Sequence, residues 1–279
     1  MLEALAAFAK VLLYAGSLSG AGAAFAWASL GQRLGPVATI APLIVMAGAG
    51  LTLLASVATI LILVQRLGGD FSPSMLSAVF EGPPGLAAGL QLAGAAMLLF
   101  FARGRGPAWI ARVAGGGLVV ASFAVNGHAA AAGLVSGIIA LVHVLAAAWW
   151  FGALLILWPA CRRLAGAGLT ELIRHFSRIA LAVVTNLVLA GVLLILTLVD
   201  FSHAPWLSPY GQALAIKLSM AGVVLCLALY NKARLTRRLT NEDGVAAAAL
   251  RRSITAEIGL FVAVISATSF LTTYTSPHT

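Results

Sequence analysis

The sequence predicts an all-α protein: a polytopic bundle of eight transmembrane helices that forms one membrane domain over residues 1–279. Composition is the first observation behind this fold class. The chain is 61% hydrophobic and 9% charged, whereas a soluble domain is about half apolar and about a quarter charged. The second observation is a series of apolar segments of roughly 20 residues, enough to cross a bilayer as a helix. Because lipid offers no hydrogen bonds to the backbone, such spans must be helical.

Eight apolar segments follow one another along the chain, and short connections join most of them. The predicted spans are Leu5–Leu30, Val37–Val64, Gly85–Phe101, Trp109–Val125, Leu134–Pro159, Ile179–Val199, Gln212–Tyr230 and Ile254–Tyr274. In the longest outer connection, Ser72-Pro73 is an N-cap followed by a proline at the first helical position, which predicts a short amphipathic helix on the membrane surface. Paired glycines in the first two spans permit close helix approach.

The distribution of positive charge predicts the orientation of the bundle. When the spans alternate in direction, 14 of the 17 Lys and Arg residues fall on one side. The positive-inside rule makes that side cytoplasmic, so both termini face outward. The net charge of +9 is then explained by topology and by anionic lipid on the inner leaflet. A nucleic-acid partner is therefore not expected, and membrane lipid is the expected surrounding.

A few polar side chains interrupt the apolar spans or lie at their outer ends. Such groups are costly in lipid and commonly functional. Within the spans we note Lys10, His143, Lys217 and the amide of Asn186, and at the outer ends Asn126, His128 and His203. In the predicted topology four of the five histidines lie on the outward side, and His175 alone lies on the cytoplasmic side.

This clustering of histidines favours a metal site. Neutral imidazole is the most common protein ligand for transition metals and suits copper. His128 and His143 lie on either side of a tight turn between two antiparallel helices, so they could share one ion, with His203 as a further ligand. Asn126, Lys10, Lys217, Trp150 and Asn186 are candidates for the pathway or for positioning the site. Alternatively, His143 donates a hydrogen bond to a neighbouring carbonyl, His128 is a solvated loop residue, and Trp150 only packs.

Five segments of the second half resemble the copper-resistance D family (CopD/PcoD). They are Asn126-Gly127-His128-Ala129, LVHVLAAAWWFGALL at 141–155, His175-Phe176-Ser177-Arg178, SPYGQALAIKLSMAGVVLCLALYNKARL at 208–235, and LRRSITAEIGLFVAVISATSFLTTYTSP at 250–277. The resemblance covers residues 126–279. It implies a protein of the bacterial inner membrane that handles copper with a periplasmic copper-binding partner, with His128 and His143 as the natural ligands. We expect no fused periplasmic copper-binding domain, and the chain has only five methionines.

Three functions are compatible with these features. The first is a copper permease, not an enzyme, that captures copper from the outer side and moves it inward; no P-loop for an ATP-driven pump is present. The second is a haem-binding membrane redox protein, because histidines on neighbouring helices can ligate haem. The third is an assembly factor that delivers copper to another membrane protein without transporting it. The sequence favours the permease.

Overall fold

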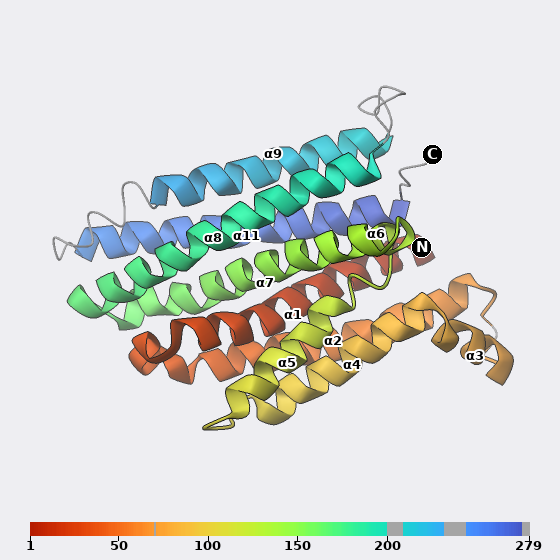
Figure 1. The fold of residues 1–279 in the computed structure, drawn as a ribbon, viewed down its shortest axis with the longest axis horizontal. Coiled ribbons are helices and arrows are strands. Elements are labelled where there is room, and N and C mark those ends of the chain that lie inside the picture. The colour runs from red at the N-terminus through yellow and green to blue at the C-terminus, as the bar shows by residue number, and fades with distance from the viewer. Residues whose placement is uncertain (70, 200–208, 232–243, 275–279) are drawn as a thin grey trace.

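The computed structural model describes residues 1–69, 71–199, 209–231 and 244–274. Within these residues all regular structure is helical and no strand is present. The long helices run roughly side by side along the longest axis of the molecule (Figure 1). The elements are α1 (Leu2–Leu30), η1 (Gly31–Thr39), α2 (Ala41–Arg66), α3 (Pro73–Glu81), α4 (Pro83–Phe101), α5 (Ala108–Ala121), α6 (His128–Ala131), α7 (Leu134–Arg163), α8 (Gly166–Leu198), α9 (Pro209–Tyr230) and α11 (Gly244–Tyr274).

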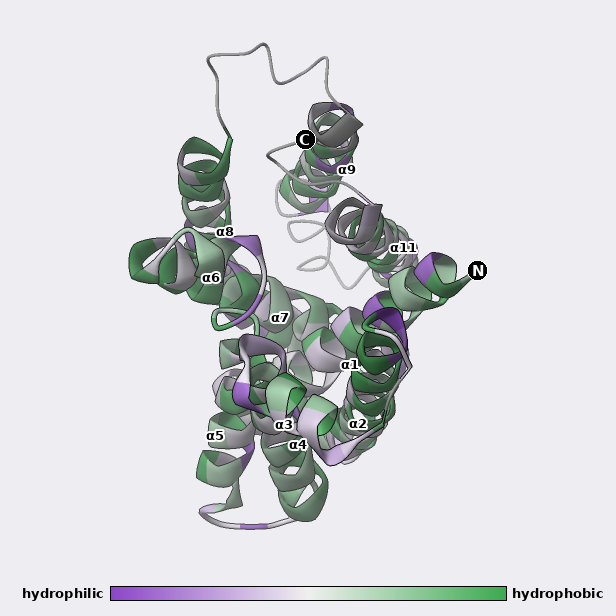
Figure 2. Ribbon diagram, turned by 90° about the vertical axis from the view of Figure 1, so that its right-hand side faces the viewer, coloured by the Kyte–Doolittle hydropathy of each residue, from purple (hydrophilic) through white to green (hydrophobic). Residues whose placement is uncertain are grey.

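Each of the eight predicted spans coincides with a helix, and six helices of the described chain are long and apolar enough to cross a membrane: α1, α2, α4, α7, α8 and α11. Two apolar segments are shorter, Ala108–Ala121 in α5 and Leu214–Tyr230 in α9. In Figure 2 the helical ribbon is mostly hydrophobic green, and purple gathers near helix ends and connections. The fold is therefore that of a multi-pass helical membrane protein, while the count of eight spans stays a prediction.

Glycines bring α1 into close contact with α2 and α7. A Cβ atom at Gly16 would lie 2.7 Å from the backbone nitrogen of Thr52, and one at Gly20 would lie 2.9 Å from that of Ala49. A Cβ atom at Gly152 on α7 would overlap the backbone of Gly22 on α1. Because small residues let backbones approach, van der Waals packing supplies the attraction that the hydrophobic effect cannot provide between helices in lipid. The close helix approach expected from the glycines is present.

The short helix α3 begins as the sequence predicts. Ser72 has an extended backbone, and its Oγ accepts a hydrogen bond from the backbone N–H of Met75 at 3.4 Å. Pro73 occupies the first helical position, where its missing N–H costs nothing. This cap satisfies one of the N–H groups that the first helical turn leaves without an intrahelical partner.

Candidate functional site

His143 lies on α7 with its ring directed at α8. Its Nδ1 is 3.1 Å from the carbonyl oxygen of Leu187. Because a carbonyl can only accept a hydrogen bond, Nδ1 carries the proton and donates, and in the neutral ring Nε2 then carries a lone pair. This hydrogen bond is the structural alternative raised for His143. It is also the arrangement by which ligand histidines are oriented, with one nitrogen bonded to a carbonyl and the other available to a metal.

Helix α8 also provides the space that the His143 ring occupies. Gly191 lies one turn beyond Leu187, and a Cβ atom there would lie 3.3 Å from Cε1 of His143 and 3.5 Å from Nδ1. A larger residue at position 191 would therefore press on the imidazole. The imidazole ring is thus hydrogen-bonded to the backbone carbonyl of Leu187 and packs against Gly191, which has no side chain to displace it.

Lys217 on α9 brings a positive charge to the same region. Its ammonium interacts electrostatically with His143, as a repulsion between the lysine and a protonated imidazole. The same repulsion acts on a metal cation held at Nε2, because like charges repel strongly where water is scarce. Lys217 therefore acts electrostatically on His143, and its positive charge would oppose a cation held at Nε2; the role of both residues in a site stays a prediction.

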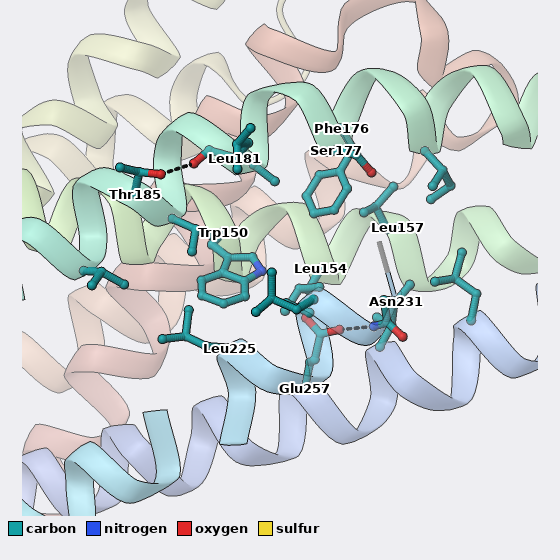
Figure 3. Close-up of a pocket in the computed structure, with 18 of the residues that line it drawn as sticks. Trp150, Leu154, Leu157, Phe176, Ser177, Leu181, Thr185, Leu225, Asn231 and Glu257 are labelled. Atoms are coloured by element: carbon teal, nitrogen blue, oxygen red, sulfur yellow. Dashed lines mark hydrogen bonds between the residues drawn. The ribbon is translucent and has the colours of Figure 1, made fainter. Parts of the chain in front are cut away.

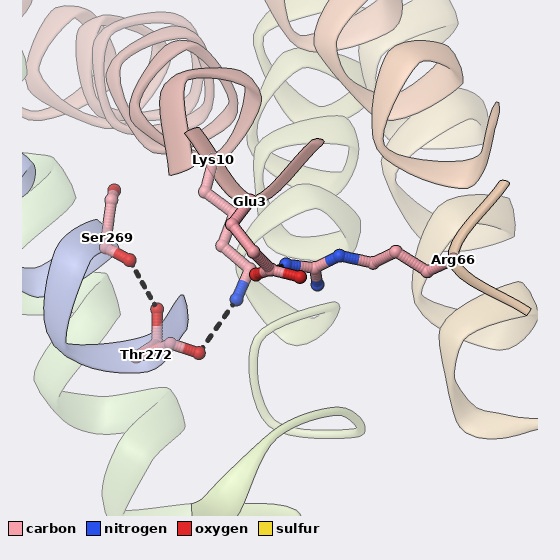
Figure 4. A network of polar contacts seen from close by, with 5 residues as sticks. All are labelled: Glu3, Lys10, Arg66, Ser269 and Thr272. Carbon is pink, nitrogen blue, oxygen red and sulfur yellow. Dashed lines mark hydrogen bonds and ion pairs between the residues drawn. The ribbon is translucent and has the colours of Figure 1, made fainter. Parts of the chain in front are cut away.

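Lys10 and Asn126 belong to a different place, a polar cavity of about 240 Å³ at the end of the bundle that carries the N-terminus. Lys10 Nζ donates to the carbonyl oxygen of Thr272 at 2.9 Å, and Arg66 is paired with Glu3 nearby (Figure 4). These interactions explain Lys10 as a tie between α1 and α11. They do not connect it to His143.

The remaining predicted site residues are dispersed. His128 begins the short helix α6 and is half-buried. The exposed Asn186 donates from its amide to the carbonyl of Ala182 in its own helix, at 2.9 Å. Trp150 is buried and packs edge-to-face on Phe261, with ring centroids 5.4 Å apart. Within the described ranges no three His, Cys, Asp or Glu side chains gather as a metal site; His203 lies outside them.

An apolar cavity with a volume of about 420 Å³ lies between α7, α8, α9 and α11. Trp150, Leu154 and Leu157 form part of its wall, and the amide Nδ2 of Asn231 donates a hydrogen bond to Glu257 at one end (Figure 3). Glu257 is 3% exposed. Glu257 is not among the site residues predicted from the sequence, although it lies within the span expected at Ile254–Tyr274. Its signal was present in the sequence: an acidic residue inside an apolar segment.

His175, on the predicted cytoplasmic side, has a structural environment. Its Nε2 is 3.2 Å from the carbonyl oxygen of Ser29, and the hydroxyl of Ser29 accepts a hydrogen bond from Trp149 at 2.9 Å. Trp149 in turn stacks on Phe176 with centroids 5.7 Å apart. These contacts tie α1, α7 and α8 together. His175 is therefore a histidine with a structural role, with which His143 can be compared.

The fold and the polar groups within it define a multi-pass helical membrane protein with ionisable side chains inside the bundle. Residues 170–271 match the family described as copper resistance protein D. The predicted resemblance is confirmed there. The match contains Leu187, Lys217, Asn231 and Glu257, whereas His128 and His143 precede it. Curated proteins and solved structures give no significant match.

Proposed function

We propose that this protein is a copper permease of the bacterial inner membrane that binds copper from the outer side and moves it inward. It acts as a transporter and not as an enzyme. In this proposal the chain crosses the membrane eight times, both termini face the outer side, the His143 region lies in the outer half of the bilayer, and the basic connections lie on the cytoplasmic side. A periplasmic copper-binding protein supplies the metal.

The observation that carries this proposal is the His143 imidazole, held inside the bundle with Nδ1 bonded to Leu187. A neutral imidazole in this tautomer presents Nε2 as a ligand without the desolvation cost of a charged group. The copper-resistance family match to the helices that face His143 supports copper as the metal. We propose His128 as the partner ligand, because it precedes α7 by only a few residues and is half-buried; His203 is a further candidate.

The first test is copper content of the purified protein after loading and washing. Wild type should retain copper, and His143→Ala and His128→Ala should each lose most of it. His175→Ala is the matched control, because it removes the imidazole that packs on Ser29 and should leave copper content unchanged. Equal copper in wild type and His143→Ala would overturn the site.

Flux in proteoliposomes tests transport separately from binding. Vesicles with wild type should take up copper faster than empty vesicles, and His143→Ala should reduce uptake to the level of empty vesicles. Copper binding without flux would indicate the delivery or assembly role instead. A Soret band in the purified protein would indicate the haem-binding alternative.

A further inference from the structure

We propose that Glu257 is the proton-binding site that couples copper movement to the proton gradient across the membrane. The inference rests on the proposed permease function and assigns its driving force. It concerns a different part of the bundle from His143: Glu257 lies on α11 at the cavity between α7, α8, α9 and α11.

The surroundings of Glu257 allow this carboxyl to be either protonated and neutral or ionised, depending on what fills the cavity. It is 3% exposed, and the cavity beside it is otherwise lined by apolar side chains, the amide of Asn231 and two hydroxyls, Ser177 and Thr185. An ionised carboxylate taken from water without a counter-charge costs several kcal/mol. Whenever water is excluded from the cavity, Glu257 must therefore hold a proton or be paired with a cation. When water or a cation enters, the carboxylate can exist as an ion.

No fixed cation among the described residues is recorded as the partner of Glu257. On α7, Cys161 interacts with Arg251 of α11, and Arg162 and Arg163 lie in the last turn. On α8, His175 is bonded to Ser29 of α1. On α9, Cys226 is exposed. Among the described residues, Glu257 is paired with the neutral amide of Asn231, and a bound proton is the simplest way to remove its charge when water leaves the cavity.

Asn231 is suited to either state of the carboxyl. Its Nδ2–H donates to Oε1 of Glu257, an interaction that a protonated and an ionised carboxyl both accept, while Oε2 gains or loses the proton. In each cycle one O–H bond forms with a proton from the outer side, and the same bond breaks to release the proton to the cytoplasm. No oxidant or reductant is required. The water-excluding state forms only with the proton bound, so copper moves inward together with a proton.

The test uses the full-length protein in proteoliposomes, with valinomycin and equal potassium concentrations holding the membrane potential at zero. A difference of one pH unit, acidic outside, stores about 1.4 kcal/mol and supports up to about tenfold accumulation for one proton per copper ion. Wild type should accumulate copper above equilibrium under this gradient. Glu257→Gln keeps the shape and the hydrogen bond to Asn231 but cannot exchange a proton, so accumulation should fall to the equilibrium value while exchange of radioactive copper continues.

Two control variants show whether the effect depends on the carboxyl group at position 257. Glu171→Gln removes the exposed carboxyl paired with Arg33 at 3.3 Å and should accumulate copper as wild type does. Glu257→Asp keeps a carboxyl and should retain gradient-driven accumulation. The proton coupling would be overturned, and the permease function left standing, by either of two results. One is copper uptake by wild type that does not depend on the pH gradient, and the other is accumulation by Glu257→Gln at the wild-type level. The absence of any copper flux in wild type would overturn the permease, and the coupling with it.

Discussion

The two halves of the bundle are packed in different ways. In the most apolar stretch of α1, 44% of residues are buried within the protein, whereas in α8 the share is 6%. Glycines hold α1 against α2 and α7, while the second half encloses a cavity of about 420 Å³ and carries His143, Lys217 and Glu257. The difference teaches that close packing is centred on α1 and α7, whose apolar stretches are 44% and 50% buried, whereas α8 borders the cavity and is packed less closely.

The largest expected effect comes from the close packing of α1 and α7. Gly152→Leu would force a side chain into the backbone of Gly22, and the cost should be about 4 kcal/mol or more, because neither helix can yield without losing its neighbours. Thermal unfolding in detergent should show a large loss of stability or no folded protein. Gly222→Leu, at a position on α9 with open space around it, is the control and should fold normally. Similar losses in both variants would refute the contrast.

A buried hydrogen-bond network in the first half offers a second test. Ser56 donates to Gln91 at 2.8 Å, and Gln91 donates to Ser122 at 3.1 Å. Gln91→Leu removes the acceptor of the Ser56 hydroxyl, while the Ser122 hydroxyl still donates to the carbonyl of Val119, and should lower the free energy of unfolding by about 1–3 kcal/mol. Asn186→Leu removes an exposed amide from α8 and should change stability by less than about 0.5 kcal/mol. A larger loss for Asn186→Leu would show that the second half depends on its polar groups for folding.

A third test asks whether the charge of Lys217 lowers the copper affinity of the His143 site in the second half. Lys217→Met removes the positive charge that acts on His143 and should raise the copper affinity of the site about tenfold, which is about 1.4 kcal/mol of relieved repulsion. Competition with a colorimetric copper chelator measures the change. The double variant with His143→Ala should show no gain. Unchanged or weaker binding in Lys217→Met would mean that copper binds beyond the reach of this charge.

The smallest effect is expected where the cavity is filled. Ala228→Leu adds a side chain to the wall of the apolar cavity, and stability should change by less than about 1 kcal/mol because the space exists. The same variant should slow copper flux if the cavity must change shape during transport. Chemical denaturation and proteoliposome uptake, measured on one preparation, separate the two effects. A large loss of stability would show that the cavity wall is already close-packed.

The sequence predicted the helices well because their lengths follow from unbroken apolar runs. Helix α8 begins at Gly166, ahead of the span predicted from Ile179, because the more polar segment before the apolar run, which carries Arg174 and Arg178, is also helical. The pairing of α1 with α7 through Gly22 and Gly152 was not predictable, since the relative position of two helices depends on packing and not on either sequence alone.

The candidate site was predicted in part. His143 and Lys217 stood out as ionisable groups in apolar segments, and both lie in the second half. The partner of His143 is a backbone carbonyl, which no sequence pattern distinguishes from its neighbours. Asn126 and Lys10 were placed with His143 because they share its predicted depth, but the structure puts them at a separate cavity. Glu257 was missed despite a visible signal, and depth alone could not show that it meets Asn231.

The contact of Gly22 with Gly152 has a mechanical consequence. It is a backbone-to-backbone junction between α1 and α7, so any relative movement that preserves it is a rotation about that point. His143 lies nine residues from Gly152 along α7, about 14 Å at 1.5 Å per residue, and Leu157 in the cavity wall lies on the other side. A rigid tilt of α7 about this junction would therefore move His143 and Leu157 in opposite directions.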